Sequence, residues 1–324
     1  MKAHRVCLLA LLLLAVFSLS GCGKKGLAAL HVDGTHLADE KGNPVQLKGI
    51  STHGIGWFPQ YLTEECIHDV HELFGINALR IAMYTAEDGG YCTGGDQAAL
   101  KALVEKGVDI CEKEGIYAII DWHILRDGNP MKHFDEASAF FDEMSRKYAD
   151  KTHVLYEICN EPNGDYVAWP QIREYAEAII PVIRANDKDA VIICGTPSYS
   201  KLCYAPRSNP VEDPNVIYTM HFYAATNKEN NRKDLVDAME SGVPVFVSEF
   251  GISEASGNGR LDPESGDAWL DLCDEYHISY VTWNLSNKDE TCALLKPDCT
   301  KTSGFTPEDL TESGLWYYHR LTGK

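Results

Sequence analysis

Two glutamates near the ends of apolar runs carry the clearest chemical signal in the chain. Glu161 lies in the run VLYEICNEP at 154–162, and Glu249 lies in PVFVSEFG at 244–251. Both runs are rich in β-branched and aromatic residues and are bounded by turn residues, which is typical of buried strands. In a parallel α/β barrel the C-terminal strand ends carry the active site. Two carboxylates placed there are the minimal machinery for cleaving a glycosidic bond.

Strand-like and helical patterns alternate along the chain. Eight runs predict strands, at 47–52, 78–83, 117–122, 154–159, 190–194, 216–222, 244–248 and 278–283. Helices are predicted at 63–74, 96–114, 135–149, 166–185, 228–241 and 262–275, and a last one from about 306 to 319. The connection 196–215 has no regular pattern. Eight alternating units predict an α/β fold, a (β/α)8 TIM barrel.

A small ribbon precedes the first barrel strand. An Asp-Gly dipeptide at 33–34 favours a hairpin turn, and a second turn follows at 41–44. We expect this N-terminal β-hairpin to close one end of the barrel. We predict a short linker at 22–29 and a single catalytic domain at 30–324, because a chain of 324 residues suits one barrel better than two typical domains.

The N-terminus has the pattern of a targeting segment. Basic residues among the first five positions precede an apolar stretch at 8–17, which is too short to span a bilayer. The following LSGC ending at Cys22 resembles the lipobox of bacterial lipoproteins, which implies that 1–21 are removed and Cys22 is lipidated. An ordinary cleaved signal peptide is the alternative. Either way we expect export, and with lipidation a membrane-anchored protein facing the cell exterior or periplasm.

The net charge and the cysteine content limit which ligands, metals and disulfides the chain can have. The net charge of -19 argues against nucleic acid and anionic lipid headgroups and is compatible with a neutral polysaccharide. Nine of the 11 cysteines follow Cys22, an odd number that cannot pair completely within one chain. Cys292 and Cys299 bracket a short loop and could form a disulfide. No CxxC pair or Cys/His cluster suggests zinc, so we predict no metal and no cofactor.

Polar and aromatic residues gather at the predicted strand ends. Taken alone, a glutamate or histidine there is more often a solvated or structural residue. Burying polar groups costs free energy, and the fold alone does not require so many of them in one place. The set comprises His53, Trp57, Arg80, Tyr84, Asp121, His123, Asn160, Glu161, Tyr199, His221, Tyr223, Glu249, Trp283 and Asn284. Three of these histidines with two carboxylates could instead bind zinc or iron, but Arg80 would repel the cation.

Five motifs in order resemble glycoside hydrolase family 5, nearest to its bacterial endoglucanase (cellulase) branch. They are GISTHG at 49–54, IDWH at 120–123, NEP at 160–162, MHFY at 220–223 and VSEFG at 247–251. The resemblance extends from about residue 30 to 321. It implies that Glu161 is the general acid/base and Glu249 the nucleophile. Arg80 and Tyr223 would contact Glu249, and His221 would position Glu161.

The resemblance also implies a set of substrate-binding residues. Asn160 would bind the 2-hydroxyl of the sugar under attack, Trp283 would be its stacking floor, and Lys288 and Glu290 would hold a sugar on the non-reducing side. The remaining members of the set are His53, His123, Trp57, Tyr84 and Tyr199, of which Trp57 and Tyr199 would stack on neighbouring sugars. Without the resemblance, the segment with Lys288 would be as well explained as a charged surface loop.

These inferences predict a retaining endo-β-1,4-glucanase that acts as a monomer. Its expected partners are a β-1,4-linked poly- or oligosaccharide and, through Cys22 only, a membrane. We expect a nearby anion to raise the pKa of Glu161 and Arg80 to keep Glu249 ionised. The alternatives are a β-mannanase or a xyloglucan-cleaving relative, a non-catalytic sugar-binding lipoprotein, and a metal hydrolase.

Overall fold

Eight parallel strands close into a barrel in this computed structural model, which describes residues 26–324. Cys22 and the predicted signal segment lie outside the described residues. The strands follow the barrel in the order β10-β11-β4-β5-β6-β7-β8-β9. Their bounds are β4 Lys48–Thr52, β5 Ala78–Tyr84, β6 Tyr117–His123, β7 Val154–Glu157, β8 Ile192–Cys194, β9 Val216–Tyr223, β10 Val245–Gly251 and β11 Tyr280–Leu285. The predicted TIM barrel is confirmed.

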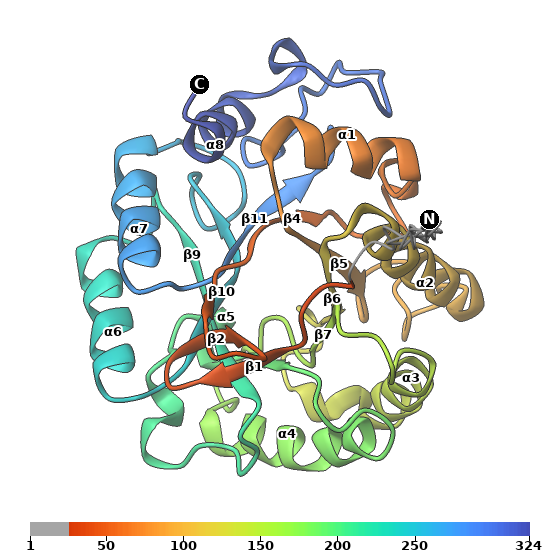
Figure 1. The fold of residues 1–324 in the computed structure, drawn as a ribbon, viewed down its shortest axis with the longest axis vertical. Helices are drawn as coiled ribbons and strands as arrows, with labels where there is room; N and C mark the ends of the chain where they lie inside the picture. The colour runs from red at the N-terminus through yellow and green to blue at the C-terminus, as the bar shows by residue number, and fades with distance from the viewer. Residues whose placement is uncertain (1–25) are drawn as a thin grey trace, which may run out of the picture.

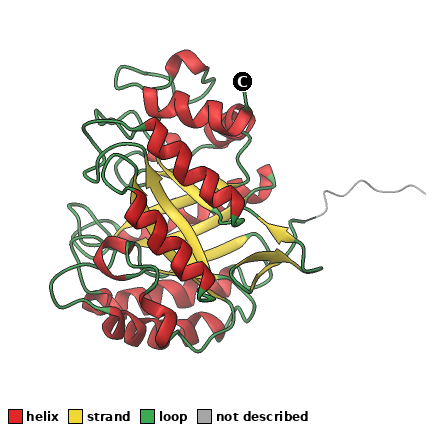
Figure 2. Ribbon diagram, turned by 90° about the vertical axis from the view of Figure 1, so that its left-hand side faces the viewer, coloured by secondary structure: helices red, strands yellow, loops and turns green. Residues whose placement is uncertain are grey.

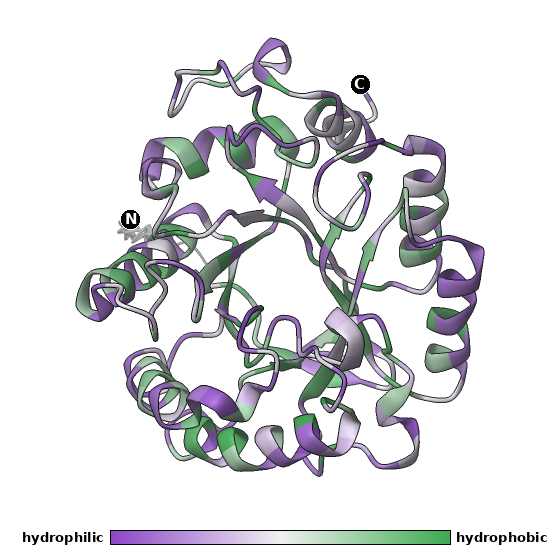
Figure 3. Cartoon of the chain, turned by 180° about the vertical axis from the view of Figure 1, so that it is seen from behind, coloured by the Kyte–Doolittle hydropathy of each residue, from purple (hydrophilic) through white to green (hydrophobic). Residues whose placement is uncertain are grey.

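Helices surround the barrel (Figures 1 and 2). They are α1 Glu64–Phe74, α2 Gln97–Glu114, α3 Phe134–Lys147, α4 Trp169–Arg184, α6 Glu229–Glu240, α7 Pro263–Glu275 and α8 Glu312–Thr322. Their apolar sides face the strands and their polar sides face outward, as the hydropathy colouring shows (Figure 3). The boundaries follow local chemistry: Thr63 caps the start of α1, and Gly75 ends it in a left-handed conformation. None of the described helices is long and apolar enough to cross a membrane.

The N-terminal ribbon covers the end of the barrel at which the strands begin, as predicted. It consists of β1 Leu30–Asp33, β2 His36–Asp39 and β3 Pro44–Val45, paired antiparallel. Leu30 and Leu37 pack in one apolar cluster with residues at the strand starts, including Leu47 and Tyr117. Figure 2 shows the ribbon at one end of the barrel; because apolar packing seals this end, the opposite end is left for the polar residues.

The segment between β8 and β9 is irregular, as expected. It contains the four-residue α5, Pro197–Ser200, and the 3-10 turn η3, Ala205–Ser208. Ser198 and Tyr199 have φ values of 62° and 61°, a left-handed conformation that is uncommon for residues other than glycine. Three further 3-10 turns are η1 Pro59–Tyr61, η2 Pro130–His133 and η4 Pro307–Asp309.

Two sequence predictions are wrong. The last helix begins at Glu312, because the segment from Pro307 forms η4 and Leu310 is extended. The possible disulfide is absent, since both thiols are free. Cys292 packs with Tyr223 and Trp283 inside the barrel mouth, whereas Cys299 belongs to the separate core that contains Phe305. The two side chains therefore do not meet.

Candidate active site

Glu161 and Glu249 face each other at the C-terminal end of the barrel. Glu161 follows β7, and Glu249 lies in β10. One carboxylate oxygen of each, together with a ring nitrogen of His221, lie within 4.8 Å of one another. The Glu161 side chain is 13% exposed, and Glu249 is 4% exposed. The two carboxyl groups are thus close and largely shielded from water, yet open to a substrate.

Both oxygens of Glu249 accept a hydrogen bond. Arg80 Nη1 donates to Oε2 over 3.1 Å, and the Tyr223 hydroxyl donates to Oε1 over 2.8 Å. Arg80 is fully buried, and burial alone would lower its pKa. The carboxylates of Asp121, Glu157 and Glu249 outweigh burial and raise the pKa of Arg80. Its permanent positive charge therefore lies directly beside the Glu249 carboxyl group.

Arg80 is itself fixed by two carboxylates to which sequence reasoning gave no role in the site. Its Nε and Nη2 donate to Glu157 over 2.7 and 3.1 Å, and Asp121 Oδ2 lies 3.0 Å from Nη2. Asp121 and Glu157 are opposite each other in the register of β6 and β7. Charged residues inside otherwise apolar strands were the signal that could have found them. A bidentate pair fixes the guanidinium plane, so these residues position Arg80.

The surroundings of Glu161 favour its protonated form. Burial raises its pKa to about 8, against the opposing charges of Arg80 and Lys201. The main cause is therefore burial, not the single nearby anion that we expected; the charges of Asp121 and Glu157 add a smaller effect. Near neutral pH this carboxyl therefore carries the proton that a general acid must supply.

His221 connects Glu161 to the interior of the barrel. Its Nδ1 lies 2.9 Å from Glu161 Oε1, and its Nε2 lies 3.0 Å from Ser248 Oγ. Burial lowers the pKa of His221 to about 4, so the ring is neutral. Ser248 Oγ donates in turn to Glu157 over 2.8 Å. This arrangement fits a Glu161 hydroxyl donating to Nδ1, with the imidazole proton on Nε2 and directed at Ser248.

Asn160 and His123 lie beside this pair and are held by several bonds. Asn160 Oδ1 accepts from Arg80 over 2.6 Å, and its Nδ2 donates to the Ile124 carbonyl over 3.1 Å. His123 Nδ1 lies 2.6 Å from Asp121 Oδ2, and its Nε2 lies 3.3 Å from Asn160 Nδ2. Burial holds the pKa of His123 well below its usual range. Both residues thus present neutral polar atoms in fixed positions.

Aromatic rings flank the glutamate pair on two sides. Near β4 and β11, His53 packs against Trp57 and Trp283, with ring centroids 5.7 and 5.1 Å apart. Tyr84 joins them, 4.5 Å from the Trp57 ring. Tyr199 follows β8, which lies across the barrel from β4, and it borders a cavity of about 190 Å³ shared with Glu161. Trp57 and Tyr199 are 43% and 44% exposed, so each offers a ring face to a ligand.

Lys288 and Glu290 also reach the site. Lys288 Nζ lies 2.6 Å from Glu290 Oε2 and 3.3 Å from His53 Nε2. Asn284 Nδ2 donates to Glu290 Oε1 over 2.9 Å. Burial is the main cause that lowers the pKa of His53 to about 3. The structure thus brings every predicted catalytic and substrate-binding residue to the barrel mouth.

The arrangement suits acid/base chemistry at two carboxyl groups rather than a metal centre made of three histidines. Among the described residues, only His221 lies with Glu161 and Glu249 in a group that could hold an ion. His53 and His123 are engaged with other partners. Arg80 occupies one oxygen of Glu249 at 3.1 Å, where its charge would repel a cation.

A family model described as "Cellulase (glycosyl hydrolase family 5)" matches residues 38–289. The chain belongs to glycoside hydrolase family 5. The predicted family and enzyme class, a glycoside hydrolase, are confirmed.

Curated relatives of this family 5 chain carry endoglucanase and cellulase names. It is 44% identical to Endoglucanase A of Butyrivibrio fibrisolvens over 90% of its own length and 68% of the relative's. It is 42% identical to Endoglucanase A of Evansella cellulosilytica over 86% of its length and 57% of the relative's. The chain thus spans between half and about two thirds of these relatives. The similarity supports the predicted endoglucanase function.

Solved structures show the same barrel. The cellulase Cel5C_n aligns with a TM-score of 0.87 and 42% identity, covering 91% of this family 5 chain and 92% of that one. A variant of the catalytic domain of Thermobifida fusca endoglucanase Cel5A, in complex with cellotetraose, aligns with a TM-score of 0.86 and 38% identity, covering 90% and 97%.

Proposed function

We propose that this chain is a retaining endo-β-1,4-glucanase that cuts internal bonds of β-1,4-linked glucan by double displacement. The observation that carries the proposal is the 4.8 Å limit on the separation of the Glu161 and Glu249 oxygens. Retaining enzymes hold their two carboxyl groups about 5–5.5 Å apart, and inverting enzymes about 6.5–9.5 Å, to leave room for a water. Glu161 and Glu249 oxygens no more than 4.8 Å apart fit the shorter, retaining range.

In the first step, a Glu249 oxygen attacks the anomeric carbon while the bond to the leaving sugar breaks. Glu161 transfers its proton to the departing glycosidic oxygen. Arg80 and Tyr223, which donate hydrogen bonds to the two Glu249 oxygens, orient the nucleophile. The products of this step are a glycosyl ester on Glu249 and an ionised Glu161.

In the second step, Glu161 takes a proton from water, and the resulting hydroxide oxygen bonds to the anomeric carbon. The ester bond breaks and Glu249 leaves as a carboxylate. Esterification removes the Glu249 charge while Arg80 remains positive, which makes an ionised Glu161 less costly at the moment when a base is needed. The sugar keeps its original configuration.

The substrate proposal rests on the shape of the site and on the relatives. Trp57, Tyr199 and Trp283 offer flat faces of the kind that stack on all-equatorial glucose rings. They lie on both sides of the catalytic pair, as binding within a long chain requires. The relatives are named endoglucanases, and the aligned Cel5A variant holds cellotetraose.

Substrate comparison tests the proposal. Rates of reducing-sugar release should be measured in parallel on carboxymethyl cellulose, mannan, xyloglucan and xylan, with Glu249→Gln as the inactive control. We expect kcat/KM for glucan to exceed that for mannan by about tenfold or more, with a fast fall in viscosity. A higher value for mannan or xyloglucan would assign the chain to one of those activities instead.

We also propose that the mature enzyme is a monomer anchored by a diacylated Cys22. The site takes all its residues from one chain, and the N-terminal sequence pattern supports lipidation. Two acyl chains give stable membrane anchoring, and the linker at 22–29 would keep the barrel near the surface. In the expressing bacterium, Cys22→Ala should release the enzyme or leave it unprocessed. Fully soluble wild-type protein without lipid would refute the anchor.

A further inference from the structure

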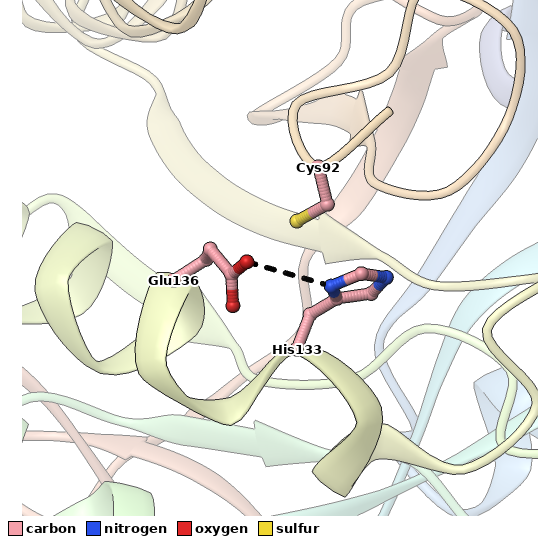
Figure 4. Close-up of side chains that lie close together, drawn as sticks. All are labelled: Cys92, His133 and Glu136. Carbon is pink, nitrogen blue, oxygen red and sulfur yellow. Dashed lines mark ion pairs between the residues drawn. The ribbon is translucent and has the colours of Figure 1, made fainter. Parts of the chain in front are cut away.

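A second group of metal-binding side chains lies outside the catalytic pair. Cys92, His133 and Glu136 each direct one ligand atom toward the others (Figure 4), and these atoms all lie within 4.8 Å of one another. Cys92 belongs to the loop after β5, His133 is the last residue of η2, and Glu136 lies in the first turn of α3. His133 Nδ1 is 3.7 Å from Glu136 Oε1.

A neighbouring carboxylate completes the group. Asp127 Oδ1 and His133 Nε2 are both buried, neither has a hydrogen-bond partner, and they lie 3.8 Å apart. The Asp127 side chain is 1% exposed. Its other oxygen accepts from the Thr85 hydroxyl over 2.7 Å, and the Thr85 carbonyl accepts from the Cys92 N–H over 2.8 Å. Asp127 is therefore fixed in a position from which Oδ1 faces the imidazole.

We propose that Cys92, His133 and Glu136 bind a zinc ion, with Asp127 as the carboxylate that orients His133. Sulfur, imidazole nitrogen and carboxylate oxygen are the three donor types that Zn²⁺ takes in proteins, and a water reaching the half-exposed site supplies the fourth. A histidine that binds a metal through one nitrogen commonly donates the other N–H to a carboxylate. Zinc on Nδ1 places that N–H on Nε2, 3.8 Å from Asp127 Oδ1, so a small movement of the ring would pair the two unpartnered atoms.

The geometry and the charges fit this ion. In a tetrahedral zinc site the ligand atoms are about 3.5 Å apart, close to the 3.7 Å between His133 and Glu136. Glu136 is 41% exposed, so its side chain is free to close the remaining distance. A bound divalent cation deprotonates a coordinating thiol directly, so Cys92 would bind it as the thiolate.

The ion would join two loops near the substrate site. It would tie the loop after β5 to the start of α3. The same loop carries Asp88, whose carbonyl accepts the Trp57 indole N–H over 3.1 Å. A zinc ion would thus stabilise the segment that supports Trp57 without contacting Glu161 or Glu249.

The test is metal binding to the full-length protein after chelator treatment and dialysis. Titration calorimetry with zinc chloride should give one ion per chain with a Kd below about 1 µM. Saturating zinc should raise the Tm by about 4 °C or more. Cobalt chloride should produce intense visible bands and a thiolate-to-cobalt charge-transfer band. Failure to bind zinc with a Kd of about 1 µM or tighter would overturn the proposal.

Variants assign the ligands. Cys92→Ser should abolish the charge-transfer band and weaken zinc binding at least tenfold, as should Glu136→Gln. Glu143→Gln is the matched control, because it makes the same change at a similarly exposed position of α3 and should bind zinc like the wild type. Asp127→Asn would direct an amide N–H at Nε2, move the imidazole proton to Nδ1, and so weaken binding about 10- to 100-fold. Zinc binding that is unchanged in Cys92→Ser and Glu136→Gln would overturn the assignment.

Discussion

The raised pKa of Glu161 should control the alkaline side of the activity profile. With a pKa of about 8 rather than the ordinary 4.5, about nine in ten Glu161 carboxyls are protonated at pH 7, against about one in 300 for an unperturbed group. The acid is needed protonated, so activity is present below this pKa and is lost as pH rises through it. We expect kcat/KM at pH 9 to be about tenfold below its plateau.

The assay compares two aryl cellobiosides over pH 5 to 10. A 4-methylumbelliferyl substrate has a poor leaving group and needs the acid, so its kcat/KM should fall above about pH 8. A 2,4-dinitrophenyl substrate needs little proton donation, and its profile should stay flat there. Glu161→Gln with the dinitrophenyl substrate is the control, since it has no proton to lose. A fall near pH 5, or the same alkaline fall in Glu161→Gln, would show that ionisation of Glu161 does not set the alkaline limit.

Three further changes test other parts of the site. Glu161→Gln should stabilise the fold by ~2–4 kcal/mol at pH 8 and by much less at pH 4.5, because the raised pKa of Glu161 in the folded state makes its ionisation costly as pH rises between these two values. Thermal unfolding at both pH values measures the change in stability. An equal change in Tm at both would contradict the prediction. Arg80→Met should lower the free energy of unfolding by about 3–5 kcal/mol, since it leaves the buried carboxylates of Asp121, Glu157 and Glu249 without their cation. A clearly smaller loss in denaturant unfolding would contradict this. Lys288→Ala should raise KM several-fold with little change in kcat, because Lys288 contacts His53 and Glu290 rather than the catalytic pair; a selective loss of kcat in steady-state kinetics would argue for a role in chemistry.

The sequence predicted the features that depend on pattern along the chain. Eight apolar runs with intervening amphipathic helices specify a barrel, and a barrel brings strand ends together. Glu161 and Glu249 were therefore identifiable, because each interrupts an apolar run where burial of a charge is costly.

Contacts between distant segments could not be assigned from the sequence. Asp121 and Glu157 bind Arg80 because of strand register and the direction of their side chains, neither of which the sequence displays. The pairing of Cys292 with Cys299 was proposed from spacing alone and failed because their side chains pack in different clusters. Cys92 lies far along the chain from His133, and only the folded loops bring them together.

In the proposed mechanism, Glu249 forms a covalent bond to the sugar. Incubation with 2-deoxy-2-fluoro-β-cellobiosyl fluoride slows hydrolysis of the glycosyl ester, so the intermediate accumulates and mass spectrometry can locate it. We predict one added fluorinated cellobiosyl group per chain, on the peptide that contains Glu249, and none in Glu249→Gln. An adduct on Glu161, or a product of inverted configuration by proton NMR with no adduct formed, would show that Glu249 is not the nucleophile of a retaining mechanism.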